Sequence, residues 1–167
     1  MEPPLAVNPP LRKPKLEDVP ALVRLFTDPD IRQYLGGPRD QPQAQVSALD
    51  LVAVEREFPA WVVVQPGSPV PVGFVSLDPH HDGKNVEVSF VLMPAAQGSG
   101  LGRAAVTAAL AEAWQLGLGN VVAETQSANA RSIHLLRALG FSAQRELIRF
   151  NEPQTIFSIQ RPVANAA

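Results

Sequence analysis

The glycine-rich stretch Gln97-Gly98-Ser99-Gly100-Leu101-Gly102-Arg103 is the most informative part of this sequence. Its three glycines alternate with other residues between an expected strand and an expected helix. Glycine lets the backbone approach a ligand closely, and the first turn of a helix offers unpaired N–H groups and the positive end of the helix dipole. Arg103 can add a charged hydrogen bond there. The stretch therefore indicates a phosphate-binding loop or, without a ligand, a tight turn.

Two known kinds of phosphate loop can be tested against this stretch. A Walker loop needs Gly-Lys followed by Ser or Thr, and Gly83-Lys84 is followed by Asn85, which excludes it. A dinucleotide-binding Rossmann-type fold is a stronger alternative, because Gly100-x-Gly102-x-x-Ala105 fits its fingerprint and Glu124 ends an expected strand about 20 residues later. However, six residues separate the preceding strand from this fingerprint, and the 43 residues after Glu124 are too few for the remaining units. This fold is kept as the less favoured alternative.

Working outward from the loop, hydrophobic periodicity predicts alternating helical and extended segments. Before the loop, helices are expected from Glu17-Asp18 ahead of Pro20, over Ile31–Leu35 and from Gln43 to Phe58, and antiparallel strands are expected at Ala60–Gln65, Val70–Leu77 and Val86–Met93. After it, we expect helices at Leu101–Leu116 and Ala130–Leu139, a strand at Val121–Thr125, and a hairpin of Ser142–Asn151 with Gln154–Ile159. The order is that of an α/β fold in one domain over residues 1–167, with its core at about 11–160.

Composition limits the class of protein. The chain has 167 residues, 46% of them apolar and 18% charged, which is typical of one globular domain. The net charge of −2 gives no basic field for nucleic acid. No apolar run approaches the ~18 residues of a membrane helix, and Met1–Pro10 lacks the pattern of a secretory signal. We therefore expect a cytoplasmic protein that binds neither nucleic acid nor a membrane.

A metal centre is not expected. The chain has no cysteine, which excludes disulfides and zinc–thiolate sites. His80-His81 lies between turn-forming residues and is interpreted as part of a polar hairpin turn. His134 is interpreted as a surface or packing residue of the last helix.

Three ordered blocks resemble the GNAT N-acetyltransferases. Glu87-Val-Ser-Phe-Val-Leu-Met-Pro94, followed by Gln97-x-x-Gly100-x-Gly102, is similar to the acetyl-CoA signature of that superfamily, and the block from Asn129 to Phe141 is similar to its second signature. The leading Glu87, the serine three residues after Asn129 and the early Leu35-Gly36-Gly37-Pro38 resemble the branch with the Rim-type ribosomal-protein acetyltransferases.

The resemblance implies a mixed, mostly antiparallel, twisted sheet of six or seven strands with about four helices. This sheet would splay between its fourth and fifth strands, Val86–Met93 and Val121–Thr125, and acetyl-CoA would insert there as cosubstrate. The expected cofactor-binding residues are Val91, Leu92, Gln97, Gly98, Ser99, Gly100, Leu101, Gly102, Arg103, Asn129 and Ser132.

The implied reaction is direct attack of an amine on the thioester in a ternary complex. Glu87 is the expected base, and strand alternation places it opposite Val86 and Val88; the alternative is a solvated strand carboxylate. Ser132 and Asn129 are expected near the sulfur. Many relatives have a tyrosine where this chain has Leu136, so Ser132 is a candidate to protonate the thiolate or to hydrogen-bond the sulfur.

The expected acceptor is an amine on a small molecule or at a protein N-terminus. It is expected to bind among the early helices, the loop after them and the closing hairpin. A non-catalytic acyl-CoA-binding module of the same fold is the alternative function, and a monomer or a homodimer is expected.

Overall fold

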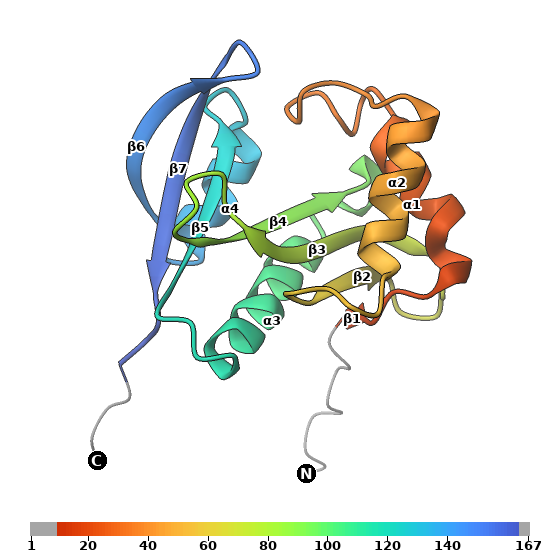
Figure 1. Ribbon diagram of the computed structural model, residues 1–167, viewed down its shortest axis with the longest axis horizontal. Coiled ribbons are helices and arrows are strands. Elements are labelled where there is room, and N and C mark those ends of the chain that lie inside the picture. Colours follow the sequence, from red (N-terminus) through yellow and green to blue (C-terminus); the bar gives the residue numbers. More distant parts are fainter. Residues whose placement is uncertain (1–9, 164–167) are drawn as a thin grey trace.

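The computed structural model describes residues 10–163 (Figure 1). The stretch examined for a secretory signal therefore lies almost wholly outside the described residues. The described helical elements are η1 (Leu16–Asp18), α1 (Val19–Thr27), α2 (Gln41–Val52), η2 (Pro94–Ala96), α3 (Leu101–Gln115) and α4 (Ala130–Ala138). The strands are β1 (Leu11–Arg12), β2 (Ala60–Val64), β3 (Pro71–Pro79), β4 (Val86–Leu92), β5 (Asn120–Gln126), β6 (Ser142–Arg149) and β7 (Glu152–Gln160).

The strands form one seven-stranded sheet in the order β1-β2-β3-β4-β5-β7-β6 across the described chain. Neighbouring strands are antiparallel except β4 and β5, which are parallel and in register only at Glu87 with Val122. Beyond that pair the two strands part, and Figure 1 shows β5, β6 and β7 turned away from β1 to β4. The predicted mixed, mostly antiparallel sheet, splayed between its fourth and fifth strands, is confirmed. So is the expectation of about four helices, since residues 10–163 form four α-helices.

This strand order excludes the dinucleotide-binding alternative. A Rossmann-type sheet is mostly parallel and is built from successive βαβ units. Here the residues before the glycine loop form a meander of antiparallel strands instead.

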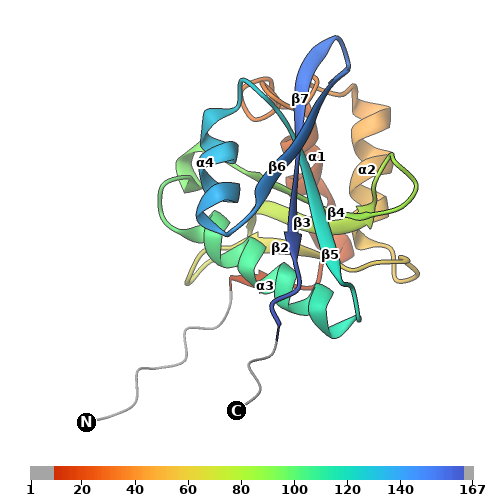
Figure 2. The same ribbon diagram turned by 90° about the vertical axis from the view of Figure 1, so that its left-hand side faces the viewer.

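Two apolar clusters hold the helices against opposite faces of the sheet (Figures 1 and 2). The cluster on the α3 and α4 side contains Val88, Val106, Leu136 and Phe157, all at most 2% exposed. The cluster on the α1 and α2 side contains Leu22, Leu25 and Val91, with Phe26 tilted against Phe74. Val88 and Val91 fall in different clusters because successive side chains of a strand point to opposite faces.

Two helix predictions need correction. α2 begins as expected, with the Asp40 carboxylate accepting the Gln43 N–H at 2.9 Å, but it ends at Val52 rather than Phe58. The chain must extend there to enter β2, and Arg56 fastens that segment to Asp50 and Asp78. The segment Ile31–Leu35 forms turns instead of a helix.

Within residues 10–163, none of the helices has the length and apolar character required to cross a membrane.

Candidate active site

The glycine loop enters α3 through two left-handed backbone positions. Gly98 has φ +79° and Gly100 has φ +83°, which glycine adopts without the strain that a side chain brings. Gly100 caps α3, and its carbonyl accepts the N–H of Ala104 at 3.0 Å. The N–H groups of residues 101–103 precede that first bond, so they have no partner within the helix. This end of α3 therefore has the form of an anion site.

Hydrogen bonds tie the loop to the end of β4. The Gln97 side-chain amide donates to the Leu92 carbonyl oxygen at 3.1 Å, and the Ser99 hydroxyl donates to the Ala96 carbonyl oxygen at 2.7 Å. Gly102 lies close behind, where an added Cβ atom would be 3.2 Å from Cδ1 of Leu92. The loop and the strand end are thus one unit of structure.

A cleft of about 1420 Å³ opens where β4 and β5 part. Its walls include β4, the glycine loop, α4, the turns after α1 and the β6–β7 hairpin. Most of the predicted site residues line this cleft: Glu87, Val91, Leu92, Gln97, Gly98, Gly100, Gly102, Arg103, Asn129 and Ser132. Ser99 and Leu101 are not among the lining residues.

Glu87 is largely withdrawn from solvent. It lies on β4 beside Val122 of β5, on the strand face opposite Val88, and only 17% of its side chain is exposed. The alternative of a solvated strand carboxylate is therefore wrong. Burial raises the pKa of Glu87 to about 7, and the nearby charges of Glu124 and Asp78 act in the same direction, while His80 opposes them. Such a carboxyl can exchange a proton near neutral pH.

Asn129 and Ser132 occupy the start of α4. The Asn129 side-chain oxygen accepts the backbone N–H of Ser132 at 3.2 Å, so Asn129 caps the helix. Both residues line the cleft. Leu136, one turn further along, is fully buried in the same apolar cluster as Val106 and also borders the cleft. The position at which the resemblance implied a tyrosine is thus held by a core residue that cannot donate a proton.

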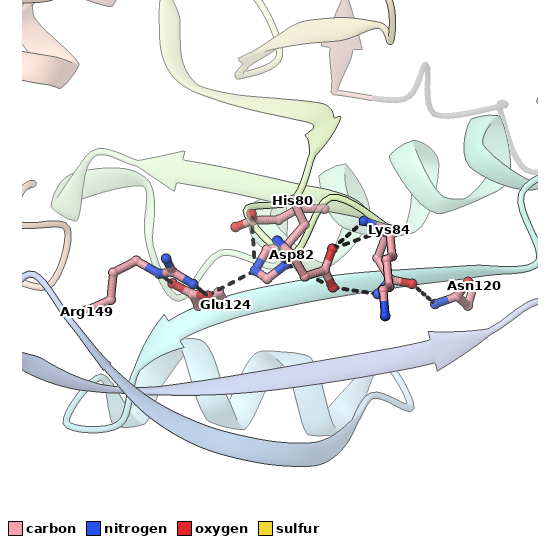
Figure 3. Close-up of polar contacts among 8 residues, drawn as sticks. His80, Asp82, Lys84, Asn120, Glu124 and Arg149 are labelled. Carbon is pink, nitrogen blue, oxygen red and sulfur yellow. Dashed lines mark hydrogen bonds and ion pairs between the residues drawn. The ribbon is translucent and has the colours of Figure 1, made fainter.

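Sequence analysis missed a buried polar cluster next to Glu87. His80 lies after β3 with a fully buried side chain, and its Nε2 is 2.9 Å from Oε1 of Glu124 (Figure 3). Arg149 binds both oxygens of Glu124, at 2.7 and 3.2 Å. The hairpin-turn interpretation of His80 placed the backbone correctly but not the side chain. His80 and Glu124 are 44 residues apart, and only the β4–β5 pairing brings them together.

The early loop and the closing hairpin face the same cleft, as expected. Tyr34, Gly37 and Arg39 line it from the turns after α1, and Phe150 and Gln154 line it from the hairpin. In the part of the chain that the structure describes, no group of three or more His, Cys, Asp or Glu side chains is arranged to hold a metal ion.

Comparison with known proteins gives the family to which this fold and cleft belong. A sequence model of the acetyltransferase (GNAT) domain matches residues 10–142. The chain belongs to the GNAT acetyltransferase family.

Solved structures from several bacteria share the fold. A structure of yncA from Salmonella typhimurium with its cofactor acetyl-CoA is 24% identical, with a TM-score of 0.71 over 94% of this chain and 96% of that one. Spermidine N-acetyltransferase from Vibrio cholerae, in complex with CoA and spermine, is 19% identical, with a TM-score of 0.76 over 90% and 94%. Ribosomal-protein-alanine N-acetyltransferase from Brucella melitensis is 21% identical, with a TM-score of 0.72 over 90% and 99%.

Proposed function

We propose that this chain is an N-acetyltransferase that moves the acetyl group of acetyl-CoA to a primary amine in a ternary complex. The observation that carries the proposal is the position of Glu87. A buried carboxyl with a raised pKa lines the same cleft as a glycine loop at a helix N-terminus. One cleft thus combines a base with an anion site.

The residues of the cleft fit acetyl-CoA. The free N–H groups at the start of α3 suit the pyrophosphate, with Arg103 in the same turn. Gly102 lines the cleft and lets the start of α3 pack closely on β4 and α4, because a Cβ there would lie 3.2 and 3.4 Å from the side chains of Leu92 and Leu135. Past Glu87, β4 has no register partner in β5, so we assign the pantetheine arm to this unpaired edge of the strand near Val91 and Leu92. When bound, acetyl-CoA supplies an acetyl thioester.

Glu87 supplies the base in this proposal. An alkylamine is protonated at neutral pH and has no lone pair with which to attack a thioester. The ionised Glu87 carboxylate accepts one proton from that ammonium, directly or through a water, and leaves the neutral amine. With a pKa of about 7, Glu87 is ionised in a large part of the molecules at neutral pH.

Ser132 is the remaining polar candidate near the sulfur. Its hydroxyl lies at the start of α4 on the cleft wall, and Leu136 offers no proton. We assign to Ser132 a hydrogen bond to the departing sulfur rather than full proton donation, because a hydroxyl is a weak acid. The second proton that the amine nitrogen loses as the amide forms then neutralises the thiolate, while the first stays on Glu87. Asn129 supports that position by capping the helix.

The acceptor is proposed to be an amine of a small molecule or of a protein N-terminus. The similar solved structures include enzymes for both kinds of acceptor, since one is a spermidine acetyltransferase and another a ribosomal-protein-alanine acetyltransferase. The Leu35-Gly36-Gly37-Pro38 segment lies at the cleft and supports the proposed kinship with the Rim-type branch. We further propose that the chain acts as a single cytoplasmic domain, as a monomer or a homodimer.

Calorimetric titration with acetyl-CoA, with CoA and NADH in parallel, tests the cofactor. Saturable binding of acetyl-CoA without NADH binding is expected. A screen of amines for CoA release then tests catalysis, with Glu87→Gln as the matched variant. The variant is expected to bind acetyl-CoA normally and to lose ~10²-fold or more in kcat. Tight acetyl-CoA binding with no transfer to any amine would favour the non-catalytic acyl-CoA-binding module instead.

A further inference from the structure

A row of polar side chains, two of them buried, adjoins Glu87, and the proposed acetyl transfer does not use it. His80 follows β3, Glu124 lies on β5 and Arg149 ends β6 (Figure 3). Nε2 of His80 is 2.9 Å from Oε1 of Glu124 and 4.0 Å from Oε2 of Glu87. The His80 side chain is fully buried and that of Glu124 is 8% exposed. Buried polar groups of this kind are costly unless they are paired, so their arrangement needs an explanation.

The hydrogen on Nε2 of His80 follows from its neighbours. Both oxygens close to Nε2 belong to carboxylates, which accept hydrogen bonds, so Nε2 carries a hydrogen and donates it to Glu124. At the other edge of the ring, Nδ1 lies 3.2 Å from the backbone nitrogen of Asp82 and 3.2 Å from Oδ2 of its carboxylate. Asp82 is itself fixed by hydrogen bonds from Lys84 and Asn85. The imidazole is therefore held at both nitrogens in one orientation.

Glu124 stays ionised beside this ring. Burial acts to raise its pKa, but the hydrogen bonds from Arg149 and His80 lower it below the usual value. Arg149 forms a two-point contact with the Glu124 carboxylate, which fixes its plane as well as its charge. Glu124 thus presents a permanent negative charge on the far side of His80 from Asp82.

We propose that His80 and Glu124 are positioning residues for the Glu87 carboxylate: Glu124 accepts the Nε2 hydrogen of His80 at 2.9 Å, and this bond holds the ring with Nε2 4.0 Å from Oε2 of Glu87. This inference rests on the proposed function, in which Glu87 is the base. It gives His80 and Glu124 a purpose that neither core packing nor the cofactor loop requires.

The two positioning residues act on Glu87 in opposite senses. His80 favours the ionised form of Glu87, whereas Glu124 and Asp78 disfavour it. Arg149 faces the pair from β6, and its charge is coupled to both Glu124 and Glu87. Removing the Glu124 charge should therefore lower the pKa of Glu87, and removing the His80 ring should raise it.

The test is a direct titration of Glu87 in the ligand-free protein. The ¹³C signals of labelled glutamate carboxyls are followed against pH, and Glu87→Gln assigns the Glu87 signal. Glu124→Gln is expected to move its midpoint down by roughly one pH unit, and His80→Phe to move it up by a similar amount. His80→Gln keeps an N–H donor but carries no charge, so its midpoint should lie between those of His80→Phe and the wild type. Glu112→Gln, exposed on α3, is the matched control.

Kinetics supply the second readout. The acid limb of kcat/KM against pH is expected to shift in the same two directions. Midpoints of Glu87 that stay unchanged, or that move in the same direction in both variants, overturn the positioning role. If His80→Phe does not fold, Glu124→Gln and His80→Gln still decide. Absence of acetyl transfer by the wild type with every amine refutes the proposed function. The titration of Glu87 needs no ligand, so it tests the positioning role independently of that result.

Discussion

Gly73 of β3 lies so close to Val91 of β4 that a Cβ atom on Gly73 would be 2.2 Å from the Val91 carbonyl oxygen. Real Cβ atoms do not approach backbone oxygens this closely, so an alanine at position 73 must displace the end of β4. Gly73→Ala is expected to cost about 1–3 kcal/mol of unfolding free energy and to weaken acetyl-CoA binding about tenfold. Urea unfolding and calorimetry measure the two effects. Gly119→Ala, with open space around it, is the control.

Substitutions at Gly102 are expected to affect acetyl-CoA binding more than the stability of the fold. A Cβ there meets only the flexible ends of Leu92 and Leu135, so Gly102→Ala should change the unfolding free energy by less than about 1 kcal/mol. Gly102→Val adds bulk at a residue that lines the cleft and should weaken acetyl-CoA binding at least tenfold. Ala104→Val, exposed in the same turn, serves as the control. Equal affinity of both valine variants for acetyl-CoA contradicts the placement of the cofactor at this loop.

The cap at α4 predicts a loss of stability that one substitution can reverse. Asn129→Ala removes the acceptor of the Ser132 N–H and should cost about 1 kcal/mol in urea unfolding. Asn129→Asp keeps an acceptor at the same place and should recover most of that stability. If the aspartate variant is as unstable as the alanine variant, the cap is not what Asn129 contributes to stability.

The raised pKa of Glu87 makes stability depend on pH. The folded protein holds a proton on Glu87 up to about pH 7, whereas the unfolded chain releases it near 4.5. The contribution of Glu87 to the free energy of unfolding is therefore fully present below about pH 4.5 and is lost as the pH rises through 7. Glu87→Gln should gain relative to wild type between pH 5 and pH 8, by up to about 3 kcal/mol. Thermal unfolding of the variant and the wild type at pH 5 and at pH 8 measures this difference. The control Glu112→Gln should show the same difference from the wild type at both pH values.

Much of the fold follows from local patterns in the sequence. The alternation in β4, the glycines at Gly98 and Gly100 and the cap position of Asn129 each reflect short-range physics. Prediction of secondary structure failed where tertiary contacts override these local preferences. The segment Ile31–Leu35 turns instead of forming a helix, because the buried Arg32 side chain donates to the carbonyls of Leu35 and Gly37.

Only the part of the candidate site that is local in the sequence could be predicted. Glu87 and the loop lie within 16 residues of each other, in a run with a recognisable spacing. His80, Glu124 and Arg149 come from three separate elements, and each alone is an ordinary polar residue. Nothing in their spacing indicates the contact, since it depends on the parallel pairing of β4 with β5 and on the register of the closing hairpin.

The single register pair between Glu87 and Val122 has a mechanical consequence. The sheet consists of two stiff leaves, one ending at β4 and the other beginning at β5, joined at that point. If the two leaves rock about this pair, the width of the cleft near the glycine loop changes most and Glu87 moves least. Ligands of different thickness can then be accommodated without displacing Glu87, the proposed base.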